Sequence, residues 1–332
     1  MPVNPIHGVP DTILVAPDSF KGTFSAIEVA VAIGRGVQAG GRPVDLCPVA
    51  DGGEGTMSAL IESLGAEVTS AQVTDPLGRP IEAELAIGDG VAIVETAAAS
   101  GLGLVAEADR DPVAATTAGT GELIVAAARS GAETIYVGVG GSATTDGGAG
   151  AIRAIERAGG LGGVRLVVLC DVRTSFADAA RVFGPQKGAS AEQVQRLTRR
   201  LNALARRLAR DPRGVPMTGA AGGLSGGLWS ACGAELVPGA AFVLDAIGFD
   251  ARMRAARAVV TGEGKLDQQS LVGKVVSEVA TRARQAGVPC HAVVGTRELD
   301  AMGARVLDLD RVLAASTLAE IEAAGRTLAE LI

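Results

Sequence analysis

Short runs of β-branched residues alternate with longer stretches rich in Ala and Leu along most of the chain. This alternation is typical of α/β proteins, in which helices pack on a sheet. Two capping boxes mark the starts of expected helices, because Ser25 is followed by Glu28 and Thr317 by Glu320. Nearer the two ends of the chain, the apolar runs predict strands over residues 13–16, 44–49, 241–246, 258–260 and 290–294.

The alternation of expected strands and helices is interrupted between residues 67 and 95. Three strand-like runs (67–74, 81–87 and 91–95) follow one another there and are joined by the turns DPLG and GDG, so hairpins replace helical crossovers. The final third returns to strand–helix alternation. We therefore expect a discontinuous Rossmann-like α/β domain made from residues 1–73 and 243–332. A second α/β domain, residues 74–242, is expected to be inserted in it, since single cores rarely grow beyond ~250–300 residues.

Composition argues against several kinds of partner. The net charge of −7 and the pI near 5.1 disfavour nucleic acid and anionic membranes. The first residues, MPVNPIHGVPD, lack the basic and apolar segments of a signal peptide, and the longest uncharged run, residues 214–234, is too rich in glycine for a membrane helix. We expect a cytoplasmic protein that is a monomer or a homodimer. The widely spaced cysteines are expected as buried thiols: Cys47, Cys170, Cys232 and Cys290.

Histidine is scarce, and this limits the chemistry. The chain has two histidines, His7 near its start and His291 within an apolar run. There is thus almost no histidine from which a Ser–His–Asp triad or a histidine metal site could be built. Catalysis would have to come from Asp, Glu, Lys, Ser, Thr and backbone amides. Phosphoryl transfer asks for little more than these groups.

Glycine-rich loops follow the expected strands, where the active sites of open α/β sheets lie. They are PDSFKG (17–22), ADGGEGT (50–56), GVGGSATTDGG (138–148), FGPQKG (183–188), GAAGGLSGG (219–227) and TGEGKLDQQSLVGK (261–274). In the last of these, glycines let amides approach an anion, lysines can neutralise phosphate, and carboxylates can hold a divalent cation or orient a nucleophile. There is no Walker A sequence, and no GxGxxG follows the first strand. A standard P-loop kinase and a nicotinamide dehydrogenase are both disfavoured.

Taken together, these loops resemble the bacterial glycerate kinase family. The matching phrases run in family order: VAPDSFKGTFSA (15–26), PVADGGEGT (48–56), TDPLGRP (74–80), TTAGTGELI (116–124), VGGSATTDGGAG (139–150), VFGPQKGA (182–189), GAAGGLSGGL (219–228) and TGEGKLDQQSLVGK (261–274). The resemblance implies transfer of the ATP γ-phosphoryl to D-glycerate with Mg²⁺, giving 2-phosphoglycerate. It also implies a Rossmann-like domain carrying both termini, a second α/β domain inserted in it, and an active site in the cleft between the two.

The chain is shorter than the family pattern in two places. Only GGLGGVR links the expected helix that ends near Ala158 to the strand that ends at Cys170, and only VRTSFADAAR precedes VFGPQKG. About fifty residues of the inserted domain are missing by comparison with a family member that has two full domains. The phosphate-type loops are retained.

The resemblance and the demands of phosphoryl transfer suggest roles for individual residues. Lys21 would contact the glycerate carboxylate or the transferring phosphoryl group, while Asp18 or Asp51 would orient the hydroxyl or act as general base. The expected substrate- and ATP-binding residues are Ser19, Gly52, Gly53, Ser142, Thr144, Lys187, Gly222, Gly223, Gly262 and Lys274. Four carboxylates are candidates to hold Mg²⁺, and about two of them would do so: Glu54, Asp146, Glu263 and Asp267. The ordinary alternatives are a surface lysine for Lys21 and helix capping for Asp18 and Asp51.

Other functions remain open at this stage. The phosphoryl group could go to the 3-hydroxyl of glycerate or to a related small hydroxy acid. A non-catalytic protein that senses a hydroxy acid or a nucleotide is a further alternative, although it would not need so many acids and lysines. The arginine-rich segment 190–210 is interpreted as a solvated helix surface.

Overall fold

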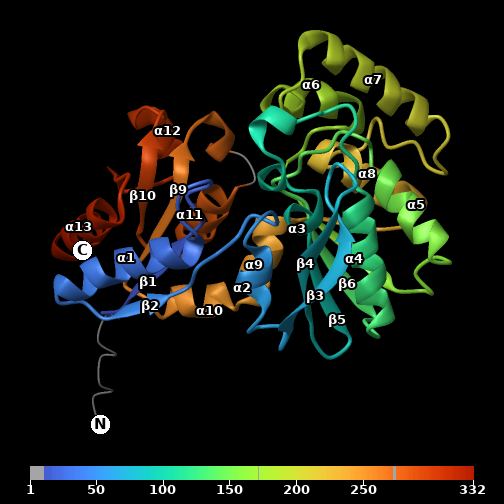
Figure 1. Ribbon diagram of the computed structural model, residues 1–332. Helices are drawn as coiled ribbons and strands as arrows, with labels where there is room; N and C mark the ends of the chain where they lie inside the picture. The colour runs from blue at the N-terminus through green and yellow to red at the C-terminus, as the bar shows by residue number, and fades with distance from the viewer. Residues whose placement is uncertain (1–10, 171, 272–273) are drawn as a thin grey trace. The chain divides into compact units, whose positions relative to one another are not determined.

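The computed structural model describes residues 11–170, 172–271 and 274–332, and His7 lies outside these ranges. The chain forms two compact α/β units. Unit 1 combines the chain up to Ala50 with Ile247–Ile332, and unit 2 is Asp51–Ala246. Each unit has its own sheet (Figure 1). The expected class, a discontinuous domain interrupted by a second α/β unit, is confirmed.

The sheet of unit 1 is entirely parallel, with the strand order β11-β10-β9-β1-β2. Its strands are β1 (Ile13–Pro17), β2 (Val44–Leu46), β9 (Ala258–Leu266), β10 (Cys290–Arg297) and β11 (Arg311–Ala314). Counted within the unit, this is the order 2-1-3-4-5 of doubly wound sheets, as the Rossmann-like expectation requires. Its helices are α1 (Ala26–Ala39), α10 (Phe249–Arg254), α11 (Val275–Ala286), α12 (Ala301–Val306) and α13 (Leu318–Leu331), with a 3₁₀ turn at Gln268–Leu271.

Helices α1 and α13 lie side by side on one face of this sheet, where they bury Ile13, Val15, Val260 and Val293 (Figure 1). Helix α11 packs on β9 outside this cluster, which places it on the other face. Both long helices on the first face begin with the predicted capping boxes, at Ser25 and Thr317. Local side-chain bonds therefore fix where each helix starts, and apolar burial fixes where it packs.

Unit 2 contains a six-stranded mixed sheet in the order β3-β4-β5-β6-β7-β8. Its strands are β3 (Glu67–Thr74), β4 (Pro80–Ile87), β5 (Val91–Glu95), β6 (Thr134–Gly138), β7 (Arg165–Cys170) and β8 (Glu235–Pro238). The predicted hairpins β3–β4 and β4–β5 are antiparallel, and the remaining pairs are parallel. Its helices are α2 (Thr56–Leu60), α3 (Thr96–Ser100), α4 (Ala118–Arg129), α5 (Ala149–Arg157), α6 (Ala179–Phe183), α7 (Ala191–Ala205), α8 (Ala220–Ala231) and α9 (Gly239–Ala246), with 3₁₀ turns at Leu102–Leu104, Glu107–Asp109, Phe176–Asp178 and Pro185–Lys187.

Three expectations differ from the structure. Residues 241–246 form helix α9 instead of a strand, because a short apolar run fits a buried helix as well as it fits a buried strand. Strand β9 continues to Leu266, so the first part of the segment 261–274 is strand and not loop. The contacts divide the chain after Ala50 and after Ala246 rather than at the predicted boundaries 73/74 and 242/243. Strand β3 pairs with β4 along its whole length, which explains why residues 67–74 belong to unit 2.

The cysteines lie mostly inside the protein, as expected for buried thiols. Cys47, Cys170 and Cys290 are buried, Cys232 is half-buried, and no disulfide joins any of the four. Burial raises the pKa of Cys47 and of Cys232 to about 11, which makes both poor nucleophiles. Within the described residues, no helix is both long enough and apolar enough to cross a membrane.

The contact between α1 and α13 leads to a stability prediction. A Cβ atom at Gly36 would lie 1.9 Å from the carbonyl oxygen of Glu322. Alanine is favoured over glycine inside a helix by about 1 kcal/mol, but an overlap with backbone forces α13 to move. We expect Gly36→Ala to lower the free energy of unfolding in urea by about 1–3 kcal/mol. The matched variant Gly214→Ala, whose Cβ meets nothing within 4 Å, should be nearly neutral. Equal stability of the two variants would contradict the described packing.

His291 makes the stability of unit 1 sensitive to pH. The side chain is buried in β10, and neither ring nitrogen has a hydrogen-bond partner among the described residues. Burial lowers the pKa of His291, while Asp310 acts in the opposite direction. The unfolded chain therefore binds a proton more readily, so stability should fall as the pH drops through the ordinary histidine pKa of about 6.5.

We expect His291→Phe to weaken this loss of stability between about pH 7 and pH 5. The measurement is urea unfolding of both proteins across that range. Other groups titrate nearby, so only the difference between the two proteins counts. A parallel pH dependence in the two proteins would rule out His291 as its source.

Candidate active site

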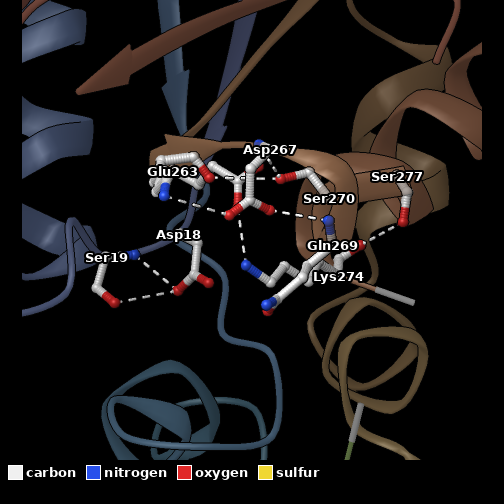
Figure 2. Close-up of polar contacts among 9 residues, drawn as sticks. Asp18, Ser19, Glu263, Asp267, Gln269, Ser270, Lys274 and Ser277 are labelled. Carbon is white, nitrogen blue, oxygen red and sulfur yellow. Dashed lines mark hydrogen bonds and ion pairs between the residues drawn. The ribbon is translucent and has the colours of Figure 1, made fainter. Parts of the chain in front are cut away.

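In unit 1, the candidate residues lie around the end of β1 and the second half of β9, where Pro17 pairs with Gly262. The strand order changes direction between these two strands, and ligands of doubly wound sheets bind at such a point. The amide of Asp18 donates to the carbonyl oxygen of Gly262 at 2.9 Å, which holds the end of β1 against β9. Asp18 is buried, and its Oδ1 accepts from the amide and hydroxyl of Ser19 at 2.7 and 3.3 Å (Figure 2). Lys21, three residues further on, is exposed.

Glu263 is the buried acid of this group, with 6% of its surface exposed. Its Oε2 lies 3.6 Å from Nζ of Lys274, and its Oε1 has no hydrogen-bond partner among the described residues (Figure 2). Burial raises the pKa of Glu263, while Ser270 and Lys274 act in the opposite direction. The carboxylate thus has a spare oxygen and a nearby cation.

Asp267 and Lys274 flank the turn that leads into α11. Oδ1 of Asp267 accepts from the amide of Gln269 at 2.8 Å, and Oδ2 lies 3.8 Å from Nζ of Lys265. Lys274 is the residue before α11, and its side chain makes no capping bond. Gly262 lies inside β9, where a Cβ atom would come within 2.4 Å of the carbonyl oxygen of Val293. The described contacts of Gly262 therefore concern strand packing.

In unit 2, two glycine-rich loops pack backbone against backbone. Asp51 is buried, and its Oδ1 accepts from the amide of Gly53 at 2.9 Å. A Cβ atom at Gly140 would lie 2.7 Å from Cα of Gly53, and Gly52 adopts φ +90° against Gly239. Glu54 is exposed and makes no hydrogen bond or ion pair with a described residue. Side chains larger than hydrogen would separate these loops.

Glu95 joins this group although the sequence analysis did not select it. It ends β5, and its Oε1 accepts from the amide of Met57 at 2.7 Å. Burial raises the pKa of Glu95 to about 7, and the nearby Glu54 and Asp51 contribute in the same direction. Its place at the carboxyl end of an expected strand was a signal that could have identified it.

Asp146 is a structural acid. Its two carboxylate oxygens accept from the amides of Thr117, Gly148 and Gly150 at 2.9–3.0 Å, and from the hydroxyls of Thr116 and Thr117 at 3.0–3.3 Å. These bonds cap the starts of α4 and α5. A metal ion would have to displace these bonds, so a structural role at the two helix starts fits Asp146 better than the metal role suggested from the sequence.

Lys187 is buried and supports the loop that follows β6. Its Nζ donates to Oγ of Ser142 at 2.8 Å and to the carbonyl oxygen of Thr144 at 2.5 Å. Burial lowers the pKa of Lys187 to about 7, and Asp146 acts in the opposite direction. These two hydrogen bonds bring together three predicted residues: Ser142, Thr144 and Lys187.

Gly222 and Gly223 also contact this loop. Both are buried with positive φ, and a Cβ atom at Gly222 would lie 2.0 Å from the carbonyl oxygen of Thr144. The amide of Gly147 donates to the carbonyl oxygen of Gly222 at 3.1 Å. Gly222 lies against protein backbone, and Gly223 lies against the backbone of Gly147 and the ring of Phe176, so both fix the shape of the loop.

The predicted residues therefore form one group within each unit. The residues of unit 1 gather around the end of β1 and the second half of β9, and those of unit 2 gather around the loops after β5 and β6. Among the described residues, no group of three or more His, Cys, Asp or Glu side chains has an arrangement that could hold a metal ion. A protein-only metal cage is thus absent from the described part of the chain.

Comparisons with known proteins agree with this arrangement. The model of the glycerate kinase family matches residues 13–160 and 156–330. The chain belongs to the glycerate kinase family. It is accordingly a kinase, an enzyme that transfers a phosphoryl group. The two matched segments meet at residues 156–160, where the shortened link after the helix near Ala158 was predicted.

Individual relatives support the assignment over most of the chain. A glycerate 2-kinase of Escherichia coli K12 is 40% identical, over 86% of this chain and 85% of the relative. A glycerate kinase of Halalkalibacterium halodurans is 38% identical, over 86% of both chains. A solved structure from Salmonella typhimurium LT2, assigned as glycerate kinase 2, has a TM-score of 0.79 at 33% identity and covers 97% of this chain and 98% of that chain.

The contacts of Asp146 predict a structural effect of its loss. In Asp146→Asn, an amide NH₂ replaces one acceptor oxygen and faces buried N–H donors. We expect the free energy of unfolding to fall by at least about 2 kcal/mol, measured in urea without added metal. Glu54→Gln, at an exposed acid, should change it by less than about 0.5 kcal/mol. An Asp146→Asn protein as stable as the parent would return Asp146 to the candidate metal ligands.

Proposed function

We propose that this enzyme transfers the γ-phosphoryl group of ATP to the 2-hydroxyl of D-glycerate, giving 2-phosphoglycerate. The observation that carries the proposal is the family match over most of the chain, together with a relative named glycerate 2-kinase. The chemistry of the candidate groups supports it, since acids, lysines and hydroxyls of the kind that phosphoryl transfer uses occur in both units. We propose that the reaction uses groups from both.

The attacking hydroxyl needs a group that orients it or accepts its proton. Asp18 and Asp51 are the candidates, because each is a buried carboxylate at the start of a glycine-containing loop. Each also accepts at least one hydrogen bond from a backbone amide, which keeps the carboxylate in a fixed direction. A fixed carboxylate can hold a hydroxyl in line with the phosphorus atom, and this positioning supplies much of the rate in phosphoryl transfer.

Charge on the transferring phosphoryl group needs cations. Lys21 is exposed after β1, and Lys274 stands at the start of α11, whose first amides have no side-chain cap. A helix start combines free N–H groups with the positive end of the helix dipole, which suits a phosphate. Lys21 and Lys274 therefore serve best as contacts to the phosphates of ATP in this proposal.

Magnesium fits two of the candidate acids better than the others. Glu263 has a buried oxygen without a described partner, and Glu54 has an exposed carboxylate without a described bond. Asp267 is partly engaged by Gln269 and Lys265, and Asp146 is fully engaged. Mg²⁺ usually takes one or two protein carboxylates and completes its coordination with phosphate oxygens and water. When bound, the ion would neutralise charge that develops on the phosphoryl oxygens.

An ADP-release assay with D-glycerate, ATP and Mg²⁺ tests the proposed activity, and phosphorus NMR of the product identifies the modified oxygen. We expect glycerate-dependent turnover and 2-phosphoglycerate. A 3-phospho product would overturn the assignment of the hydroxyl. Binding of D-glycerate or ATP without turnover would favour a sensor instead.

Removing Lys21 tests the role of the cation after β1. We expect Lys21→Ala to lower kcat by at least ~100-fold, because loss of one group that stabilises transition-state charge typically costs this much. Lys265→Ala is the matched control, since Lys265 is exposed in the same unit and paired with Glu298 at 2.9 Å. Activity of Lys21→Ala within a few-fold of the control would remove Lys21 from the mechanism.

A further inference from the structure

A small cavity lies beside Lys187 in unit 2. Its volume is about 10 Å³, and Leu102, Arg110, Asp111 and Ala143 also line it. The loops around it are held together by backbone bonds: the amide of Leu102 donates to Gly141 at 2.7 Å, and that of Ala143 donates to Ser100 at 2.9 Å. These loops follow β5 and β6, so the cavity belongs to the carboxyl side of the sheet, where ligands of α/β proteins bind.

Two cationic side chains line this cavity. The guanidinium of Arg110 makes no hydrogen bond or ion pair with a described residue, and its Nε is buried. Lys187 donates to Ser142 and Thr144, and an ammonium group has three hydrogens, so one remains. Arg110 is half-buried, and a buried N–H donor such as its Nε is costly without an acceptor. The cavity therefore favours an anion.

One acid also lines the cavity, but it is already engaged. Asp111 is exposed, and its Oδ1 accepts from the amides of Val113 and Ala114 at 2.9 and 3.0 Å. These bonds engage one of its two carboxylate oxygens in a local turn. Asp111 makes no described ion pair with Arg110. The charge of Arg110 thus stays uncompensated within the described protein.

The size of the cavity limits which anion can enter. A volume of about 10 Å³ is near the minimum that holds one water molecule, so it admits one oxygen atom of a ligand and not a phosphate group. A planar carboxylate can place one oxygen there and leave the other at the opening. Arginine binds such a group with two N–H donors in its plane.

We propose that Arg110 and Lys187 form the subsite that binds the carboxylate of the hydroxy-acid substrate. This inference rests on the proposed function and adds to it by assigning the acid end of the substrate. It assigns Lys187, which was predicted to bind substrate or ATP, to the acceptor. It also leaves Lys21 for the phosphoryl group, one of the two contacts predicted for it.

Arg110→Met tests the subsite, with Arg110→Lys as the conservative variant. We expect Arg110→Met to raise the KM for D-glycerate at least ~10-fold, as expected for a lost hydrogen bond to a charged group, with the KM for ATP unchanged. Arg110→Lys should recover part of the loss. The control Arg181→Met removes an exposed arginine of the same unit that pairs with Asp178 at 2.8 Å, and it should behave as the parent.

Calorimetry separates this inference from the proposed function. D-glycerate and glycerol, which lacks the carboxylate, are titrated into the parent and into Arg110→Met. We expect the parent to prefer D-glycerate and the variant to lose most of that preference, whether or not turnover occurs. Equal D-glycerate affinity in both proteins, at equal melting temperatures, would overturn the subsite. A rise in the KM for ATP instead would assign Arg110 to a phosphate.

If Arg110→Met melts early, Arg110→Lys and Arg110→Gln replace it in the same titration. Unchanged D-glycerate binding in either folded variant would then count against the inference, and weakened D-glycerate binding with unchanged ATP binding would support it. Absence of turnover by the parent, with D-glycerate still bound, would refute the proposed phosphorylation of D-glycerate alone.

Discussion

The buried carboxylate of Asp146 is the interaction on which the candidate site of unit 2 depends. It accepts from Thr116, Thr117, Gly148 and Gly150, and these residues belong to two segments about thirty positions apart. One side chain thereby fixes the starts of α4 and α5 and the loop between β6 and α5. Ser142 and Thr144 lie in that loop and receive Lys187. The loop that carries Ser142 and Thr144 is therefore held at its helix end by a single satisfied acid.

Glycine allows the same loops to approach one another. The segment around Gly53 contacts Gly140, and Gly222 contacts the backbone of Thr144, at separations that leave no room for a Cβ atom. Glycine-rich loops are commonly interpreted as cradles for phosphate. In unit 2, several of these glycines are used for backbone packing. Polar side chains such as Glu95 and Lys187 are then held at fixed positions between loops.

Sequence reasoning succeeded where the determining signal is local. The capping boxes at Ser25 and Thr317 and the hairpins after Glu67 were predicted, because a cap or turn depends on residues a few positions apart. Residues 241–246 were assigned wrongly because a short apolar run has no distinguishing period. The structural role of Asp146 was not predicted, since its donors Thr116 and Thr117 come from another segment. Arg110 belongs to none of the recognised phrases, and only the cavity singles it out.

Burial acts on an acid and a base of unit 2 in opposite senses and gives them similar pKa values. The pKa of Glu95 rises to about 7, and that of Lys187 falls to about 7. At neutral pH, both side chains are therefore near the point where charge is gained or lost at little cost. An anion placed beside Lys187 favours its charged form, and a cation placed near Glu95 favours the carboxylate. Binding beside either side chain can therefore change its charge, and for Lys187 the change favours an anion such as the proposed substrates.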